Sequence, residues 1–211
     1  MNIHPSSPLQ VVGLAGSLRP GSLTRFATHI ALEGAQEFGA QTELLDLNDF
    51  NLPFCDGKKP DALLPEGVRQ LRAKIRGSQG IILATPQYHG SFSGVLKNAL
   101  DWMGFAEFEG KMIGLIGVAG GSTGAMDALN GLRAIGRALH AWVIPEQVSI
   151  AESRNQFNPD GSVKDPRLDA RLREVGHQVA KYARLHNSEK FMEFLEMYER
   201  APINPGAMRD N

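Results

Sequence analysis

The fold of this chain is decided by one stretch, Gly13-Leu14-Ala15-Gly16-Ser17-Leu18-Arg19-Pro20-Gly21-Ser22. A short apolar run precedes it and an amphipathic pattern follows it, so a buried strand turns here into a helix. The first N–H groups of a helix lack partners, and the helix dipole adds positive potential there. With the Arg19 guanidinium and the hydroxyls of Ser17 and Ser22, they predict a phosphate site. A serine that only caps the helix would give the same pattern.

Length and composition indicate one α/β domain with a short extension. The chain has 211 residues, 42% of them hydrophobic and 21% charged, with a formal net charge of -1. This balance gives no reason to expect nucleic acid as a partner. A single cysteine, Cys55, excludes a disulfide framework, and the six histidines lack the spacing of metal ligands, so no metal site is expected. With neither a secretory signal nor a run long enough to span a membrane, we expect a cytoplasmic protein that has no membrane partner.

Strand and helix patterns alternate along the chain. Strands are expected at 9–15, 42–47, 80–85, 111–119 and 142–150, with helices at 22–38, 66–77, 93–103, 124–139 and 166–185. This alternation predicts a parallel sheet covered by helices on both faces, and such sheets bind ligands at the carboxyl ends of their strands. In the strand order 2-1-3-4-5, the first, third and fourth strands are central neighbours. Each of these three ends in a turn rich in glycine or hydroxyl groups, so one ligand could span them.

The turn after the third strand is expected to be a loop running from Pro86 through Gln87, Tyr88, His89 and Gly90 to Ser91. An aromatic side chain and backbone amides at a strand end suit a planar ring that lies across the sheet edge. In the alternative interpretation, Tyr88 only covers the core and His89 is an ordinary loop residue.

The turn after the fourth strand is Gly120-Gly121-Ser122. Residues without side chains let backbone N–H groups approach a ligand closely. Donors at the pyrimidine edge of a flavin would stabilise its electron-rich reduced state. A glycine-rich helix cap is the alternative.

Two motifs carry a family resemblance. They are Gly16-Ser17-Leu18-Arg19-x-x-Ser22 and Pro86-x-Tyr88-His89-Gly90-Ser91-x-x-Gly94-x-Leu96-Lys97-Asn98-Ala99-x-Asp101-Trp102. Over residues 9–185 the chain resembles the NADPH-dependent FMN reductases, a family that includes quinone, azo-dye and chromate reductases. The resemblance implies a flavodoxin-like three-layer fold around a five-stranded parallel sheet.

The resemblance also implies a cofactor and a reaction. FMN would bind non-covalently, with its phosphate on the loop of Ser17, Arg19 and Ser22 and its ring against 86–90 and 120–122. Hydride would pass from NADPH or NADH to FMN and then to a small acceptor such as a quinone, flavin, azo dye or metal oxyanion. Because such transfer depends on alignment, we assign no catalytic side chain.

Family members usually form homodimers or homotetramers, and the resemblance places Lys97, Asp101 and Trp102 near the subunit contact. The simpler interpretation of Lys97 and Asp101 is an ion pair within one helix. We expect residues 1–187 to form the FMN-binding domain. Residues 188–211 would form a helix and tail that could pack at a subunit contact.

Two other functions remain open at this point. A flavodoxin-like electron carrier would bind FMN without reacting directly with NAD(P)H, but such carriers are usually acidic and lack an arginine in the phosphate loop. A flavin-binding regulatory or scaffold protein is the other. The sequence leaves open the acceptor, the preferred nicotinamide and the role of Cys55.

Overall fold

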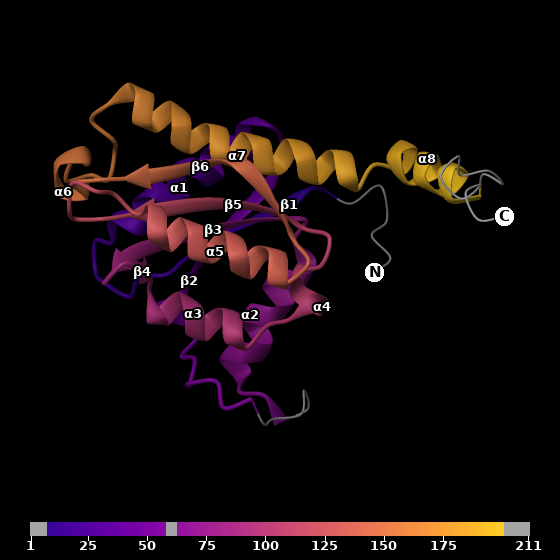
Figure 1. Cartoon of the computed structure of the whole chain (residues 1–211), viewed down its shortest axis with the longest axis horizontal. Helices are drawn as coiled ribbons and strands as arrows, with labels where there is room; N and C mark the ends of the chain where they lie inside the picture. Colours follow the sequence, from indigo (N-terminus) through magenta and orange to yellow (C-terminus); the bar gives the residue numbers. More distant parts are fainter. Residues whose placement is uncertain (1–7, 58–62, 201–211) are drawn as a thin grey trace, which may run out of the picture.

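The computed structural model describes residues 8–57 and 63–200, and it shows a parallel sheet between two layers of helices (Figure 1). Residues 1–7 and the last part of the expected tail, residues 201–211, lie outside the described residues. Besides the two-residue strand β4 (Ser91–Phe92), which pairs with β3, the sheet has five strands, in the spatial order β2 (Gln41–Asp46), β1 (Gln10–Ala15), β3 (Gly80–Tyr88), β5 (Met112–Val118) and β6 (Trp142–Ile150). All four pairings between them are parallel. The predicted order 2-1-3-4-5 is therefore confirmed.

Helices cover both faces of the sheet. The first face is packed by α1 (Leu23–Glu37) and α7 (Pro166–His186). The second face is packed by α2 (Glu66–Gly77), α3 (Gly94–Asp101) and α5 (Met126–Ala138). The short elements η1 (Leu47–Asp49), α4 (Phe105–Phe108) and α6 (Ser153–Gln156) complete the connections.

The central strands are apolar on both sides because both sides are covered. In β3, Ile82 and Ala84 join the apolar cluster under α1 and α7, whereas Ile81 and Leu83 join the cluster on the other face. Alternate residues of a strand point to opposite faces, so a doubly covered strand must be apolar at every position. This explains the continuous apolar run from which the strand was predicted.

Helices α1 and α7 lie in close backbone contact. A Cβ on Gly34 would stand 2.1 Å from the carbonyl oxygen of Arg173, and one on Gly176 would stand 1.6 Å from that of Ala31. No larger residue fits at either crossing point. This contact fixes α7 beside α1. It thereby also positions the connection that leads from β6 to α7.

The prediction of a loop over 86–91 was partly wrong. Strand β3 continues to Tyr88 and forms a hairpin with the two-residue strand β4 (Ser91–Phe92). His89 and Gly90 make the turn, with φ of 52° and 75°. Two-residue hairpin turns of type I′ require positive φ at both positions, so His89 and Gly90 are turn residues.

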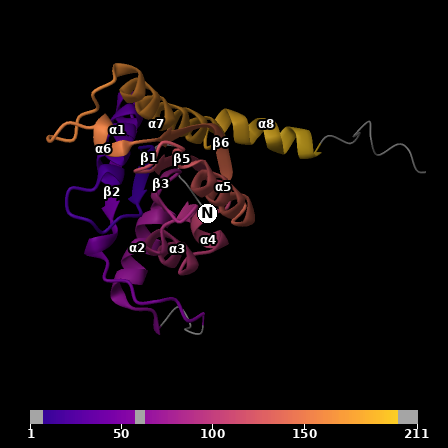
Figure 2. The ribbon, with the colours of Figure 1, turned by 60° about the vertical axis from the view of Figure 1, so that its left-hand side comes forward.

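Helix α8 (Glu189–Arg200) was predicted, and it projects away from the sheet and its covering helices (Figures 1 and 2). It continues the chain from the end of α7. Three apolar side chains along it are exposed, namely those of Met192, Phe194 and Met197. Across the described ranges, no helix is long and apolar enough to cross a membrane.

Candidate functional site

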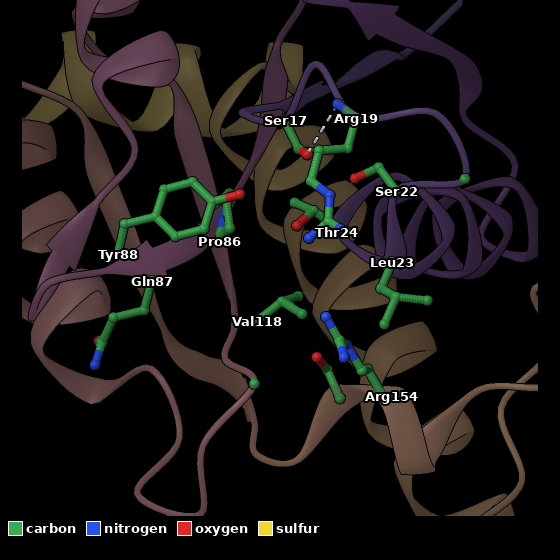
Figure 3. Close-up of a pocket in the computed structure, with 13 residues that line it drawn as sticks. Ser17, Arg19, Ser22, Leu23, Thr24, Pro86, Gln87, Tyr88, Val118 and Arg154 are labelled. Carbon is green, nitrogen blue, oxygen red and sulfur yellow. Dashed lines mark hydrogen bonds between the residues drawn. The ribbon is translucent and has the colours of Figure 1, made fainter.

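A pocket of about 480 Å³ lies where the carboxyl ends of the central strands meet the start of α1 (Figure 3). Its volume falls within the range that small-molecule and cofactor sites occupy. The structure brings seven predicted site residues to its lining: Ser17, Arg19, Ser22, Pro86, Gln87, Tyr88 and Gly120. The turns after β1, β3 and β5 therefore face one cavity, as the strand order predicted.

Hydrogen bonds join the turn after β1 to the turn after β3. The N–H of Gly16 donates to the carbonyl oxygen of Ala84 at 2.8 Å. The Ser93 hydroxyl donates to the carbonyl oxygen of Gly16 at 2.6 Å, and it also accepts from the N–H of Leu96 as the cap of α3. The N–H of Ser93 in turn donates to the Thr85 hydroxyl at 2.9 Å. These bonds fix the spacing between the two sides of the pocket.

The loop that opens α1 presents donors to the cavity. Ser22 caps the helix by accepting from the N–H of Arg25 at 3.3 Å, which leaves its hydroxyl hydrogen able to donate. The N–H groups of the first helical turn, including those of Leu23 and Thr24, lie beyond the reach of any helical carbonyl. The Arg19 side chain extends from the loop into the pocket (Figure 3). This donor set fits a phosphate group.

Arg25 supports the backbone of this loop from behind. Its guanidinium donates to the carbonyl oxygen of Arg19 at 3.2 Å and pairs with Asp46 at 3.0 Å. Because Arg25 is held by Asp46 at the end of β2, the loop is tied to the sheet edge as well as to α1.

The opposite wall is formed by the end of β3, namely Pro86, Gln87 and Tyr88. Pro86 is buried, whereas Tyr88 is 47% exposed with its ring beside the cavity (Figure 3). Gln87 lines the same wall, but its side-chain oxygen accepts from the N–H of Ala128 at 3.0 Å. That oxygen therefore caps α5. A planar ring would fit along this wall.

Four predicted site residues do not line the pocket. His89 and Gly90 form the tip of the hairpin, and Gly121 and Ser122 lie beyond Gly120 on the surface. The carbonyl oxygen of Gly121 accepts from the N–H of Glu152 at 3.0 Å, so this residue anchors the next loop.

Six further residues line the pocket that were not predicted: Gly21, Leu23, Thr24, Val118, Ser153 and Arg154. The first three lie in or next to the predicted phosphate loop, and Val118 ends β5, two residues before Gly120. Ser153 and Arg154 follow β6, an edge strand, whereas the predicted site residues came only from turns after central strands. Their position shortly after the end of a predicted strand was the available signal.

The lining carries positive charge without negative charge. Arg19 and Arg154 are both in it, and no aspartate or glutamate of the described residues is. No group of three or more His, Cys, Asp or Glu side chains within 8–57 and 63–200 could hold a metal ion. Pocket shape and charge together suit a ligand that has a planar ring and a phosphate, which describes FMN.

Residues 9–155 match the family model of NADPH-dependent FMN reductases. The chain belongs to this family. Because the match extends from β1 through the turns after β3 and β5 into α6, it includes every loop that lines the pocket.

Curated relatives and a solved structure agree with the family. The NADPH azoreductase of Bacillus sp. (strain OY1-2) is 33% identical over 181 residues, covering 85% of this chain and 93% of that protein. The NADPH-dependent FMN reductase ArsH of Shigella flexneri is 31% identical over 183 residues, covering 84% and 70%. The NAD(P)H:(acceptor) oxidoreductase FerB of Paracoccus denitrificans superposes with a TM-score of 0.66 at 26% identity, covering 84% and 98%.

The second motif has a structural role that its sequence did not reveal. Trp102 is only 7% exposed, packs against Leu64 and Val68, and donates through its indole N–H to Pro53 at 2.9 Å. We predicted that Trp102 lies near a subunit contact, but its side chain packs against residues of its own chain. Asn98 donates to the same Pro53 carbonyl oxygen at 2.9 Å.

Cys55 is held by residues of α3, the helix that contains Asn98. Its N–H donates to the Asn98 side-chain oxygen at 3.0 Å, and its thiol contacts the Asp101 carbonyl oxygen at 3.2 Å. Lys97 and Asp101 form an exposed ion pair one helical turn apart, as the simpler interpretation predicted. The motif thus holds the long connection between β2 and α2 against the body.

Proposed function

We propose that this pocket holds FMN and that the protein works there as an NAD(P)H oxidoreductase with a small acceptor. The family gives the cofactor and the reaction class, and the pocket supplies a donor-rich phosphate loop opposite the wall formed by the end of β3. Bound FMN would supply the redox chemistry by accepting hydride from NADPH or NADH and passing electrons on. The observation that carries the proposal is the meeting of Arg19 and Tyr88 at one cavity.

Each part of the pocket has a distinct role in this proposal. Ser17, Arg19 and Ser22 hold the phosphate, while Pro86 and Tyr88 support the ring from one side. Gly120 allows the backbone to approach the ring edge closely. His89, Gly90, Gly121 and Ser122, which resemblance to the family suggested as cofactor contacts, would act by shaping the turns. No side chain needs to transfer a proton for hydride to move.

The name of the Bacillus relative supports an azo compound as one acceptor, and that of FerB supports broader acceptor use. We propose NADPH as the preferred donor, because NADPH appears in the family description and in the names of both curated relatives. A cytoplasmic location stays a prediction.

Reconstitution tests this function directly. Purified protein is stripped of flavin and titrated with FMN, and NADPH oxidation is then followed with a quinone and an azo dye. FMN-dependent turnover with at least one acceptor supports the proposal. Protein that takes up no FMN would overturn it. FMN binding without turnover favours the electron carrier.

We also propose that the chain forms a homo-oligomer through α8. Exposed apolar patches mark interaction sites, and Met192 and Met197 of α8 are 49% and 67% exposed. The exposed Lys97–Asp101 pair remains available to a partner, whereas buried Trp102 would only support its own chain. Light scattering of the full chain and of a variant lacking 188–211 tests this, because an unchanged mass would exclude α8.

A further inference from the structure

We propose that Arg154 is a second phosphate-binding residue, which closes on the cofactor phosphate from the side opposite Arg19. The inference rests on the proposed function, since it assigns one more residue to the same site. Both arginines line the pocket, and Figure 3 shows their side chains entering it from different elements. Arg19 comes from the turn after β1, and Arg154 comes from α6 after β6.

Neither guanidinium is engaged elsewhere in the described part of the chain. The backbone of Arg19 makes hydrogen bonds, but no ion pair or hydrogen bond involves its side chain or that of Arg154. Several arginines on the helices are paired with carboxylates instead. Arg173, for example, contacts Asp169, Glu33 and Glu37 within 2.8 Å. Two unpaired guanidinium groups at one pocket are therefore free to bind an anion.

The backbone beside Arg154 is held in a strained but well-anchored conformation. Glu152 has φ of 45°, a left-handed value that is strained for a residue with a side chain. Its N–H donates to the Gly121 carbonyl oxygen at 3.0 Å, and the N–H of Ser153 donates to that of Ala119 at 3.0 Å. The turn therefore fixes where the arginine side chain begins.

The same connection also packs against the start of α1. The ring of Phe157 lies 6.4 Å from the ring of Phe26, and Gly161 faces Phe26 so closely that a Cβ would stand 2.6 Å from its ring. In Figure 3 the Arg154 side chain reaches toward Leu23, in the first turn of α1. This is the end of α1 at which the proposed phosphate would sit.

Charge balance favours a second arginine at this position. A phosphate monoester carries about -1.5 to -2 charges near neutral pH. Arg19 supplies one positive charge, and the helix end supplies a partial charge of about +0.5. No carboxylate of the described residues lines the pocket to offset a further cation. Arg154 would complete the neutralisation.

The experiment compares FMN with riboflavin, which has the same ring and lacks the phosphate. Dissociation constants for both are measured by flavin fluorescence with the full chain, Arg154→Ala and a control, Arg167→Ala. Arg167 is an exposed arginine in the first turn of α7 and does not line the pocket, so the control removes the same charge. We expect Arg154→Ala to raise the FMN dissociation constant about tenfold, as for loss of a charge-assisted hydrogen bond, with riboflavin binding unchanged. Arg167→Ala should change neither.

Several results would overturn the inference. An unchanged FMN dissociation constant in Arg154→Ala would exclude a phosphate contact, and equal weakening of FMN and riboflavin would place the arginine on the ring. A raised KM for NADPH with intact FMN binding would assign it to the nicotinamide nucleotide. If the unmodified chain binds neither flavin, the proposed function itself fails, which is a separate outcome.

Discussion

The Ser93 hydroxyl donates a 2.6 Å hydrogen bond to the carbonyl oxygen of Gly16, 77 residues earlier in the chain. Both residues are buried, and each lies in a different turn of the pocket. The bond therefore ties the turn after β1 to the start of α3. It also means that a single serine both caps α3 and holds that turn.

Replacing Ser93 by alanine is expected to lower the free energy of unfolding by about 1–3 kcal/mol. The variant loses the cap of α3 and leaves the Gly16 carbonyl oxygen without its partner. Urea denaturation measures the change. The exposed serine Ser122 offers a matched control, and a loss in Ser122→Ala as large as that in Ser93→Ala would contradict the argument.

Gly16→Ala should be destabilising by about 1–3 kcal/mol, because the site is already fully packed. An added Cβ would stand 2.7 Å from the Leu96 Cβ and 3.2 Å from the Ala84 carbonyl oxygen. Gly94 is the control, since a Cβ there meets nothing within 4 Å. Thermal denaturation should show a lower midpoint for Gly16→Ala alone. Equal midpoints for the two variants would refute close packing at Gly16.

Arg19→Ala should weaken FMN binding by about 1.5–3 kcal/mol, the scale of a charge-assisted hydrogen bond. Riboflavin binding should remain as in the unmodified chain, because riboflavin has no phosphate for Arg19 to bind. Isothermal titration with each flavin checks this. Unchanged FMN affinity would show that the phosphate is held elsewhere.

Lys111 gives a pH dependence of stability that is independent of the site. Its side chain is buried and donates to the Arg76 carbonyl oxygen at 3.0 Å, and burial lowers the pKa of Lys111 from 10.5 to about 8. Glu107 opposes this shift and Arg76 adds to it. Between these two pKa values the unfolded chain binds a proton that the folded chain has released. Stability attributable to Lys111 therefore rises with pH across this window.

The comparison with Lys111→Met isolates this contribution. As pH rises from about 8 to about 10.5, the unfolding free energy of the unmodified chain should increase relative to that of the variant. Urea denaturation across that range provides the measurement. A constant difference between the two proteins would mean that the Lys111 pKa is not lowered by folding.

The strands and their order followed from the sequence because buried parallel strands are apolar at nearly every position. Sequence periodicity could not show where a side chain packs when its contacts come from residues far away in the chain. Trp102 packs inward because Pro53, Leu64 and Val68 come to it from the connection before α2. Arg154 lines the pocket from a turn whose backbone N–H groups, those of Glu152 and Ser153, are held by carbonyl oxygens in the turn after β5.

The turn at His89 illustrates a different limit. A histidine before a glycine suits a loop or a two-residue hairpin equally well, and only the pairing of Tyr88 with Ser91 distinguishes them. In the hairpin, His89 is displaced to the tip and leaves Pro86, Gln87 and Tyr88 to line the pocket. The residues with extended backbone therefore form the wall, and the two with positive φ do not.

The central claim is that FMN bound in this pocket reacts directly with a reduced nicotinamide. Anaerobic stopped-flow absorbance of the FMN-loaded protein, mixed with excess NADPH, tests it most directly. The account predicts that the flavin bleaches in one two-electron step, far faster than free FMN does under the same conditions. Bleaching no faster than that of free FMN would contradict the account and identify an electron carrier instead.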